Sequence, residues 1–298
     1  MACQIAFLLG AGRSGTTLLY KMLSLHPEVT FISNYDRVAP VWMPVSLLTR
    51  GVAPFPGVKR WAWFQSGGNA NLRWGERSRI KRLIPSPVEG EDIYLRCGLP
   101  TALRSDYRLS PATVQCLRRR FSRIATQAGG KILLSKRTAN NQRVPLLREI
   151  FPDARFIHMI RDGRAVAYSL PRVTWWPDHE IWWAGRTPRE LASTGEEPLA
   201  ICARNWVEDV RAVQAGLAMV PAEEVHELRF ESLMAHPLDE LRSILVFLGL
   251  SWSPKYEAAV RSLNLRGARV DWKTAWSEKQ VSTVTREQHA LLQELGYV

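Results

Sequence analysis

Short apolar segments recur along the chain and alternate with helical patterns. Uninterrupted apolar runs are typical of strands covered on both faces, and they predict five strands: Gln4–Leu9, Val29–Ser33, Lys131–Ser135, Arg155–Ile160 and Val225–Phe230. Apolar residues at three- and four-residue spacing predict seven helices: Gly15–Leu25, Val144–Ile150, Gly163–Leu170, Ala200–Met219, Pro237–Leu248, Pro254–Leu263 and Arg286–Leu295. This alternation predicts an α/β fold, in which helices flank a parallel sheet of about five strands.

Two long stretches do not fit the alternation. Residues 38–111 are rich in proline, glycine, arginine and tryptophan, and residues 171–198 contain four further tryptophans. Irregular segments of this length inside a compact domain are usually functional loops or lids. We therefore expect a single domain over residues 1–298 with two insertions. Their tryptophans either pack the loops onto the body or form the wall of an acceptor pocket.

The chain carries a formal net charge of +12, most of it from arginine. Two explanations remain open: a compositional bias toward arginine, or anionic ligands such as a polyphosphorylated donor or an acidic acceptor. Nucleic acid ranks last among such ligands, because no basic stretch combines with aromatic residues in a nucleic-acid motif. No run of about 18 apolar residues predicts a transmembrane helix.

Four cysteines lie far apart in the sequence and form no Cys-x-x-Cys pair: Cys3, Cys97, Cys116 and Cys202. Neither a zinc site nor a disulfide framework is therefore expected. The first residues lead directly into a strand, which leaves no room for a signal peptide. The expected location is a reducing cytoplasm.

A glycine-rich turn follows the first predicted strand. Residues 10–17 read Gly-Ala-Gly-Arg-Ser-Gly-Thr-Thr, and a helical pattern comes directly after them. A strand, a glycine turn and a helix form a phosphate-binding loop, whose backbone N–H groups bind an anion. Gly10 and Gly15 have the Walker A spacing, but Thr16 stands where a triphosphatase has lysine, and the cation is Arg13. The loop therefore predicts a phosphate-bearing ligand other than an ordinary nucleoside triphosphate.

A second phosphate-binding pattern follows the fourth predicted strand. Arg161 stands at the carboxyl end of that strand, and Ser169 lies two turns into the next helix. A guanidinium and a hydroxyl so placed can bind one phosphate together. The alternative is an ion pair of Arg161 with Asp162 that fixes the loop, with the serine facing solvent.

Together these segments resemble the sulfotransferases that use 3′-phosphoadenosine 5′-phosphosulfate. Residues 13–17, Arg-Ser-Gly-Thr-Thr, are similar to the family's 5′-phosphosulfate loop, and Arg161 with Ser169 is similar to its 3′-phosphate element. The resemblance covers residues 5–35 and 131–298. It is nearest to the bacterial and tyrosylprotein-sulfotransferase-like branches.

The resemblance implies which residues bind the donor: Gly12, Arg13, Ser14, Gly15, Thr16, Thr17, Arg161, Ser169, Arg266 and Gly267. Near the last two, Leu265 and Val270 replace an arginine and a glycine of the family pattern. The implied reaction moves a sulfuryl group from 3′-phosphoadenosine 5′-phosphosulfate to a hydroxyl without a metal. Arg13 and Lys136 would supply the positive charge that stabilises the leaving group.

The acceptor hydroxyl also needs a general base. Cytosolic sulfotransferases have a histidine two residues after the strand-end lysine, where this chain has Thr138. The tyrosylprotein branch has a glutamate, whose place falls on Tyr35 with Asp36 beside it. Asp36 is therefore the predicted base, and Tyr35, His179 and Glu180 are the alternatives.

The sequence as a whole predicts a sulfotransferase that acts on a hydroxyl of a small molecule, glycan, lipid or peptide. One alternative is a nucleotide or small-molecule kinase, which Thr16 and the lack of a Walker B carboxylate disfavour. A non-catalytic nucleotide-binding module is the other alternative, and the presence of Arg13 and Lys136 disfavours it. The acceptor's identity and the oligomeric state cannot be read from the sequence.

Overall fold

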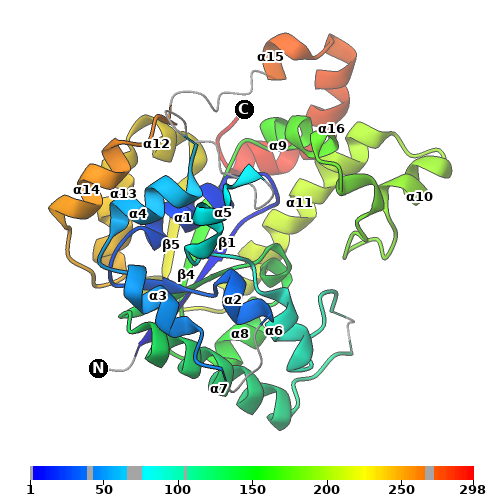
Figure 1. Ribbon diagram of the computed structural model, residues 1–298. Coiled ribbons are helices and arrows are strands. Elements are labelled where there is room, and N and C mark those ends of the chain that lie inside the picture. The colour runs from blue at the N-terminus through cyan, green and yellow to red at the C-terminus, as the bar shows by residue number, and fades with distance from the viewer. Residues whose placement is uncertain (1–2, 39–42, 66–75, 104–105, 266–271) are drawn as a thin grey trace.

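A five-stranded parallel sheet forms the centre of the molecule (Figure 1). The computed structural model describes residues 3–38, 43–65, 76–103, 106–265 and 272–298. The strands are β1 (Gln4–Leu9), β2 (Val29–Phe31), β3 (Ile132–Lys136), β4 (Arg155–Ile160) and β5 (Val225–Arg229). Their order is β2-β3-β1-β4-β5, and every neighbouring pair is parallel. The predicted α/β fold with about five parallel strands is confirmed.

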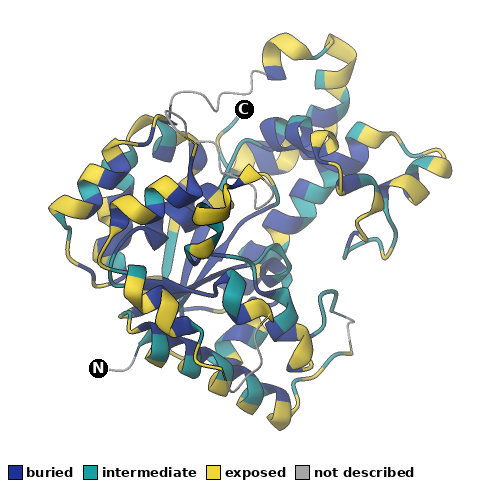
Figure 2. Ribbon diagram, viewed as in Figure 1, coloured by how far each residue is buried: buried dark blue, intermediate teal, exposed yellow. Residues whose placement is uncertain are grey.

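Helices bury both faces of this sheet, which is why its strands lack alternation. Successive residues of β1 point to opposite faces, so Ala6 and Leu8 join one apolar cluster while Phe7 and Leu9 join another. The first cluster includes residues of α1 (Thr16–Ser24), α4 (Pro56–Trp63), α12 (Phe230–Ala235), α13 (Pro237–Phe247) and α14 (Pro254–Arg261). The second includes residues of α6 (Glu91–Arg96), α7 (Pro111–Ala128), α8 (Val144–Ile150) and α11 (Pro198–Leu217). Figure 2 shows β1 to β4 mostly buried between these layers, whereas the edge strand β5 is partly exposed.

The tryptophan-rich stretch from 171 to 198 packs on a third apolar cluster beside α11. The elements around it are α9 (Gly163–Ser169), η3 (Leu170–Arg172), η4 (Trp176–Asp178), α10 (Pro188–Ser193) and α16 (Glu278–Glu294). Trp176 and Ile181 are buried there. A small apolar core of its own therefore holds this stretch in place.

The stretch from 38 to 111 is more helical than the sequence predicted. It contains α3 (Ser46–Val52), α4, α5 (Arg79–Leu83) and α6, and α2 (Asn34–Val38) ends where it begins. Helices of five to eight residues are too short to show a periodic pattern, and Pro56 at the start of α4 reads as a breaker although it suits that position. The longer α7, which begins at the end of the stretch, was also missed. Its Leu117, Phe121 and Ile124 do follow helical spacing.

None of the described helices is long and apolar enough to cross a membrane. The longest of them, α11, has 20 residues. Its Asp209 is buried, and polar side chains such as Arg204 interrupt its apolar face.

The structure joins Cys97 and Cys116 in a disulfide, contrary to the expectation that the chain would form none. Cys97 caps the C-terminal end of α6, Cys116 lies on α7, and these two helices pack together. Their Cα atoms are 5.4 Å apart although 19 positions separate them in the sequence. The pairing depends on how the two helices pack, so the spacing alone could not reveal it. Cys3 and Cys202 are free thiols.

We predict that the unreduced, denatured chain has two reactive thiols, those of Cys3 and Cys202, and that reduction exposes Cys97 and Cys116 as well. Alkylation followed by mass spectrometry measures this number. Reduction should also lower the free energy of unfolding by about 3 kcal/mol, because the disulfide closes a loop of about 20 residues. A Cys97→Ser variant should free the thiol of Cys116. Four alkylated cysteines before reduction would contradict the pairing.

Candidate functional site

The carboxyl ends of the central strands border a cavity of about 1140 Å³. Eight residues that the sequence assigned to the site line it: Gly12, Arg13, Gly15, Thr16, Thr17, Lys136, Arg161 and Ser169. The sheet order explains this convergence, because β1 lies between β3 and β4 and the carboxyl ends of these three parallel strands lie side by side. The volume exceeds the 300–1,000 Å³ or so of an ordinary small-molecule site, so there is room for a donor and an acceptor together.

The loop after β1 is held in a fixed shape. Gly10 has φ 145°, and a Cβ there would lie 2.5 Å from the Met159 carbonyl oxygen. Gly15 has φ 90°, and a Cβ there would lie 2.4 Å from the Phe230 ring. The amide of Asn141 clamps Gly10, accepting from its N–H and donating to its carbonyl, both at 3.1 Å. Only glycine fits at both loop positions. The backbone between β1 and the N-terminus of α1 is therefore held in one conformation.

Arg13, Arg161 and Ser169 come together beside this loop. The Arg13 Nε donates to the Ser169 hydroxyl at 3.0 Å, and the Arg161 Nη1 donates to the Arg13 carbonyl at 2.9 Å. The Arg161 guanidinium lies 4.2 Å from the centre of the Phe230 ring. Burial lowers the pKa of Arg161, and the charge of Arg13 lowers it further. An anion between these two guanidinium groups would relieve both effects.

Asp162 does not form the loop-fixing pair with Arg161 that the sequence left open. Its carboxylate instead accepts hydrogen bonds from the Arg164 backbone at 2.9 Å and from the Arg164 guanidinium at 3.0 Å. Arg161 therefore keeps its place beside the cavity, where it also contacts Phe230.

Lys136, at the end of β3, forms an ion pair with Glu89, and both side chains line the cavity. The Lys136 side chain is almost fully buried. Arg137 forms a second ion pair with Glu89. Burial raises the pKa of Glu89, but Lys136 and Arg137 outweigh that effect and lower it to about 2. This carboxylate is therefore ionised at neutral pH and lies against the lysine that the sequence placed at the reaction centre.

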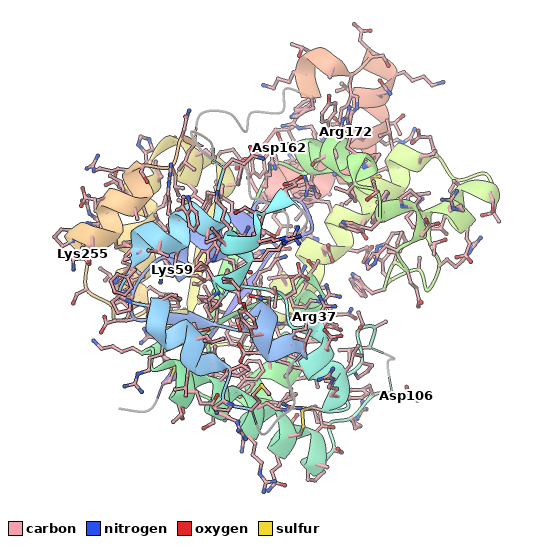
Figure 3. All side chains as sticks on the ribbon, viewed as in Figure 1. Arg37, Lys59, Asp106, Asp162, Arg172 and Lys255 are labelled. Carbon is pink, nitrogen blue, oxygen red and sulfur yellow. A yellow bond between two sulfur atoms is a disulfide. The ribbon has the colours of Figure 1, made fainter. Side chains whose placement is uncertain are left out.

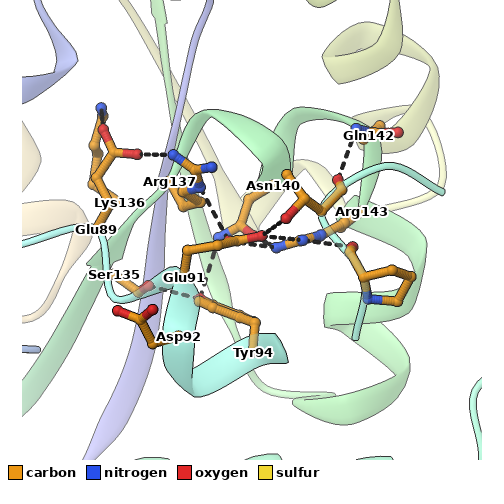
Figure 4. A network of polar contacts seen from close by, with 12 residues as sticks. Glu89, Glu91, Asp92, Tyr94, Ser135, Lys136, Arg137, Asn140, Gln142 and Arg143 are labelled. Atoms are coloured by element: carbon orange, nitrogen blue, oxygen red, sulfur yellow. Dashed lines mark hydrogen bonds and ion pairs between the residues drawn. The ribbon is translucent and has the colours of Figure 1, made fainter. Parts of the chain in front are cut away.

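A buried polar network holds Glu89 at this position (Figure 4). Arg137 also bonds Glu91 at 3.0 Å, and the fully buried Arg143 bonds the same carboxylate at 2.9 Å. Nearby, the hydroxyls of Tyr94 and Ser135 are 2.8 Å apart. Removing one partner of a buried pair typically costs about 3–5 kcal/mol, so the segment that carries Glu89 is firmly fixed to the end of β3.

Asp36, the predicted base, does not line the cavity. Its Oδ2 accepts from the backbone N–H and the hydroxyl of Ser33 at 2.8 and 2.6 Å, and its Oδ1 accepts from the hydroxyl of Ser46. It is 8% exposed, and these bonds join the end of β2 to α3. Tyr35 also points elsewhere, because its hydroxyl donates to the carbonyls of Arg82 and Leu83 at 3.2 Å. The geometry therefore does not fit Asp36 or Tyr35 as the base.

The sequence did contain a signal for Glu89. Residues 38–88 include a single acidic residue, Glu76, and Glu89, Glu91 and Asp92 then follow within four positions. Acidic residues that follow so long a basic stretch are candidates for ion pairs with the cations at the carboxyl ends of the strands. The gapless reading of residues 34–40 did not extend to this cluster.

The tryptophan-rich stretch forms the opposite wall of the cavity. Trp175, Trp176, Trp182, His179 and Glu180 line it. His179 and Glu180 are exposed, so both remain candidates for contact with an acceptor. Within the described ranges, no group of three or more histidine, cysteine, aspartate or glutamate side chains could hold a metal ion. The predicted donor residues Arg266 and Gly267 lie outside the described residues.

Asp209 of α11 joins this stretch to the phosphate-binding loop. Its Oδ1 accepts from the Trp182 indole N–H at 3.1 Å, while Asn205, also on α11, accepts from the Trp183 indole at 3.2 Å. Burial raises the pKa of Asp209 to about 6, although hydrogen bonds from Trp182, the Gly12 backbone and Asn141 oppose the rise. One buried carboxylate thus touches both walls of the cavity.

Comparison with known proteins agrees with this geometry. A family model described as the sulfotransferase family matches residues 6–254. The chain is 24% identical over 262 residues to omega-hydroxy-beta-dihydromenaquinone-9 sulfotransferase Stf3 from Mycobacterium bovis, covering 82% of this chain and 62% of that protein. It is 22% identical over 253 residues to protein-tyrosine sulfotransferase 2 from Gallus gallus, covering 84% and 52%. The chain thus spans only about half to three fifths of the length of these relatives.

A solved structure shows the same fold. Sulfotransferase STF9 from Mycobacterium avium superposes with a TM-score of 0.62 at 16% identity, covering 99% of this chain and 77% of that chain. The sulfotransferase domain from the curacin biosynthetic pathway superposes with a TM-score of 0.52 at 15% identity, covering 97% of each chain.

We predict that Asp209→Asn flattens the pH dependence of folding stability. Because its pKa is raised in the folded state, the stability that Asp209 contributes is full below its unfolded pKa of about 4 and is lost as the pH rises through about 6. The raised pKa of Asp209 corresponds to a loss of ~3 kcal/mol in the free energy of unfolding between about pH 4 and pH 7. Urea unfolding across that range measures it, with the exposed Asp239→Asn as the control. Equal pH dependence in wild type and Asp209→Asn would show that this group does not titrate as described.

Proposed function

The chain belongs to the sulfotransferase family, and on that basis we propose that it transfers the sulfuryl group of 3′-phosphoadenosine 5′-phosphosulfate to a hydroxyl. The convergence of Arg13, Lys136, Arg161 and Ser169 on one cavity is the observation that carries this proposal. A donor with a 3′-phosphate and a 5′-phosphosulfate needs two separate cationic sites. The structure offers a pair of arginines with a serine, and a lysine at the end of the adjacent strand.

The donor's 5′-phosphosulfate would bind the loop between β1 and α1. Backbone N–H groups at the start of α1 favour an anion there, and the Ser14 hydroxyl in the same loop is buried with no hydrogen-bond partner within the described part of the chain. Arg161 and Ser169 would bind the 3′-phosphate. Since the transferred group is a sulfuryl, the lysine of a Walker loop is not required, and Thr16 fits its position.

Lys136 would stabilise the charge that builds on the bridging oxygen as the sulfur–oxygen bond breaks. Binding of the donor to Lys136 would also affect Glu89. In the structure Lys136 is paired with Glu89, and that pairing lowers the pKa of the carboxyl. When the anionic donor attracts Lys136, Glu89 loses one of its two cationic partners and becomes a better base. We therefore assign to Glu89, in place of Asp36, the removal of the acceptor's proton.

The acceptor would enter between Glu89 and the tryptophan-rich wall. Trp175, Trp176 and Trp182 offer flat apolar surfaces against which a ring or an acyl chain packs well. The names of the relatives indicate that one acts on a hydroxylated dihydromenaquinone and another on protein tyrosine. Both acceptors combine a hydroxyl with a large apolar or aromatic group, and we propose the same class for this chain.

We propose the cytoplasm as the location, so the disulfide predicted above would form once the purified chain is oxidised outside the cell. A reducing compartment would keep Cys97 and Cys116 as thiols, whereas an oxidising one would keep the disulfide that the structure shows. Rapid acid quenching of cells that express the chain, followed by alkylation, distinguishes these two states.

We predict that the chain binds adenosine 3′,5′-bisphosphate, the product of the donor, in the presence of a chelator. Arg161→Ala should weaken this binding by about 2–5 kcal/mol, because a buried charged hydrogen bond is lost. Isothermal calorimetry measures it. The control is Arg172→Ala, since Arg172 lies at the end of η3 near α9, outside the lining of the cavity (Figure 3). Tighter binding of magnesium–ATP than of the bisphosphate would instead support a kinase.

We predict that Glu89→Gln lowers turnover about 100-fold or more, because the amide cannot accept the acceptor's proton. Binding of the bisphosphate should not weaken, since Lys136 is then released from its ion pair. Transfer of radiolabelled sulfate is measured with an acceptor that the wild type uses, chosen from 2-naphthol, a long-chain alcohol and a tyrosine peptide.

Two controls accompany this measurement. Asp92→Asn changes a nearby carboxylate that pairs with Arg37, and it should leave turnover unchanged. Asp36→Asn should lower stability more than turnover, since its bonds join β2 to α3. Normal turnover in Glu89→Gln, together with a loss in His179→Ala or Glu180→Gln, would move the base to the tryptophan-rich wall.

A further inference from the structure

More than half of the chain's net charge comes from a sixth of its length. Residues 38–88 contain eight lysine and arginine residues and one glutamate, a net charge of +7 out of +12 for the whole chain. Of the seven that the structure describes, none lines the cavity described above. Lys59 and Arg77 are buried, whereas five are exposed or partly exposed: Arg50, Arg60, Arg79, Lys81 and Arg82. A compositional bias spread along the chain would not concentrate charge in this way.

The same region exposes an unusual amount of apolar surface. Seven of the fourteen exposed large apolar side chains in the described residues belong to or flank α3, α4 and α5: Leu47, Leu48, Phe55, Val58, Trp61, Ile80 and Leu83. Ile80 and Leu83 are 67% and 68% exposed. Single exposed apolar residues are common, but a group of this size marks an interaction surface.

These residues lie on three helices that pack on one another, and we call their exposed sides the α3–α5 surface. Helix α4 packs against both α3 and α5, and exposed stretches of all three helices are visible in Figure 2. The Lys81 Nζ lies 5.1 Å from the centre of the Trp61 ring, so α5 and α4 place a cation and an aromatic ring side by side. Arg50 and Arg79 are exposed on α3 and α5. Cations and apolar side chains are therefore interleaved.

We propose that the α3–α5 surface binds an anionic lipid bilayer. Basic side chains are attracted to anionic headgroups, while tryptophan, phenylalanine and leucine side chains enter the boundary of the acyl region. A second copy of the chain fits less well, because two strongly basic surfaces would repel each other across a shared interface. Nucleic acid would use the charge but would leave the aliphatic side chains of Leu47, Ile80 and Leu83 without a partner.

The surface lies close to the cavity along the chain. The chain leaves α5 at Leu83 and reaches Glu89 six residues later, a distance of at most about 20 Å. The Trp63 indole of α4 donates to the Pro85 carbonyl at 3.0 Å and ties this connection to the surface. Binding to a bilayer would therefore bring the acceptor side of the cavity near the lipid boundary.

Vesicle co-sedimentation of the full chain tests this inference. The probes are phosphatidylcholine vesicles with and without phosphatidylglycerol, at low and high salt. The wild type should bind the anionic vesicles, and salt should weaken the binding. The paired substitutions Arg50→Glu with Arg79→Glu should weaken binding tenfold or more, because each basic residue near the surface adds attraction. Ile80→Ser with Leu83→Ser should weaken it at both salt concentrations.

Matched controls lie on other faces. Lys279→Glu with Arg286→Glu changes the same charge on α16, which packs against α9 and α11, and Met219→Ser with Val246→Ser removes two exposed apolar groups elsewhere. All control pairs should bind vesicles as the wild type does. Thermal unfolding and binding of adenosine 3′,5′-bisphosphate confirm that each variant is folded.

Several outcomes would overturn the inference. Absence of vesicle binding, equal binding to neutral and anionic vesicles, or equal loss in the control pairs would each do so. A dimer that the Ile80 and Leu83 substitutions dissociate, without vesicle binding, would make the surface an interface between copies. Tighter binding to RNA than to anionic vesicles would make it a nucleic-acid site. Vesicle binding is measured without donor, so the Glu89→Gln variant should bind vesicles as the wild type does. Failure of the proposed vesicle binding can therefore be told apart from failure of the proposed sulfuryl transfer.

Discussion

The site depends on the ion pairs that fasten Glu89 and Glu91 to the end of β3. Glu89 lies just before α6 and Glu91 is the first residue of that helix, and both follow a segment rich in cations. Their carboxylates form ion pairs with Lys136, Arg137 and Arg143. Without these pairs, a nearly buried lysine would be left without a counter-charge in a cavity that Arg13, Arg137 and Arg161 also line. The pairing keeps the positive charge of the site in place until an anionic ligand can share it.

The cavity therefore has two walls with different physical origins. One is polar and preorganised, made by the loop after β1, the end of β3 and the start of α9. The other is aromatic and is held by its own apolar core beside α11. Asp209 accepts a hydrogen bond from Trp182 of the aromatic wall and one from the Gly12 backbone of the polar wall. This buried carboxyl group therefore connects the two walls. This division suits a reaction in which one substrate is highly charged and the other carries a large apolar part.

The sequence predicted those features that local patterns determine. All five strands were placed to within two residues, and five predicted residues of the loop after β1 line one cavity with Lys136, Arg161 and Ser169. The features it missed depend on long-range packing. The disulfide requires α6 and α7 to lie side by side, and Glu89 reaches Lys136 only because its loop folds back over the sheet edge. Asp36 was chosen because it lies beside the position of the family's glutamate, but its oxygens accept hydrogen bonds that join the end of β2 to α3.

Phe230 contacts both Gly15 and Arg161, although it enters the structure only after β5, the last strand to be added along the chain. The cavity proposed to bind the donor is therefore complete only when the segment after the edge strand has folded against the loop after β1. Under the proposed function, affinity for the nucleotide and completion of the sheet are thus thermodynamically linked. During synthesis, the growing polypeptide would complete this proposed nucleotide site only after Phe230 has been added.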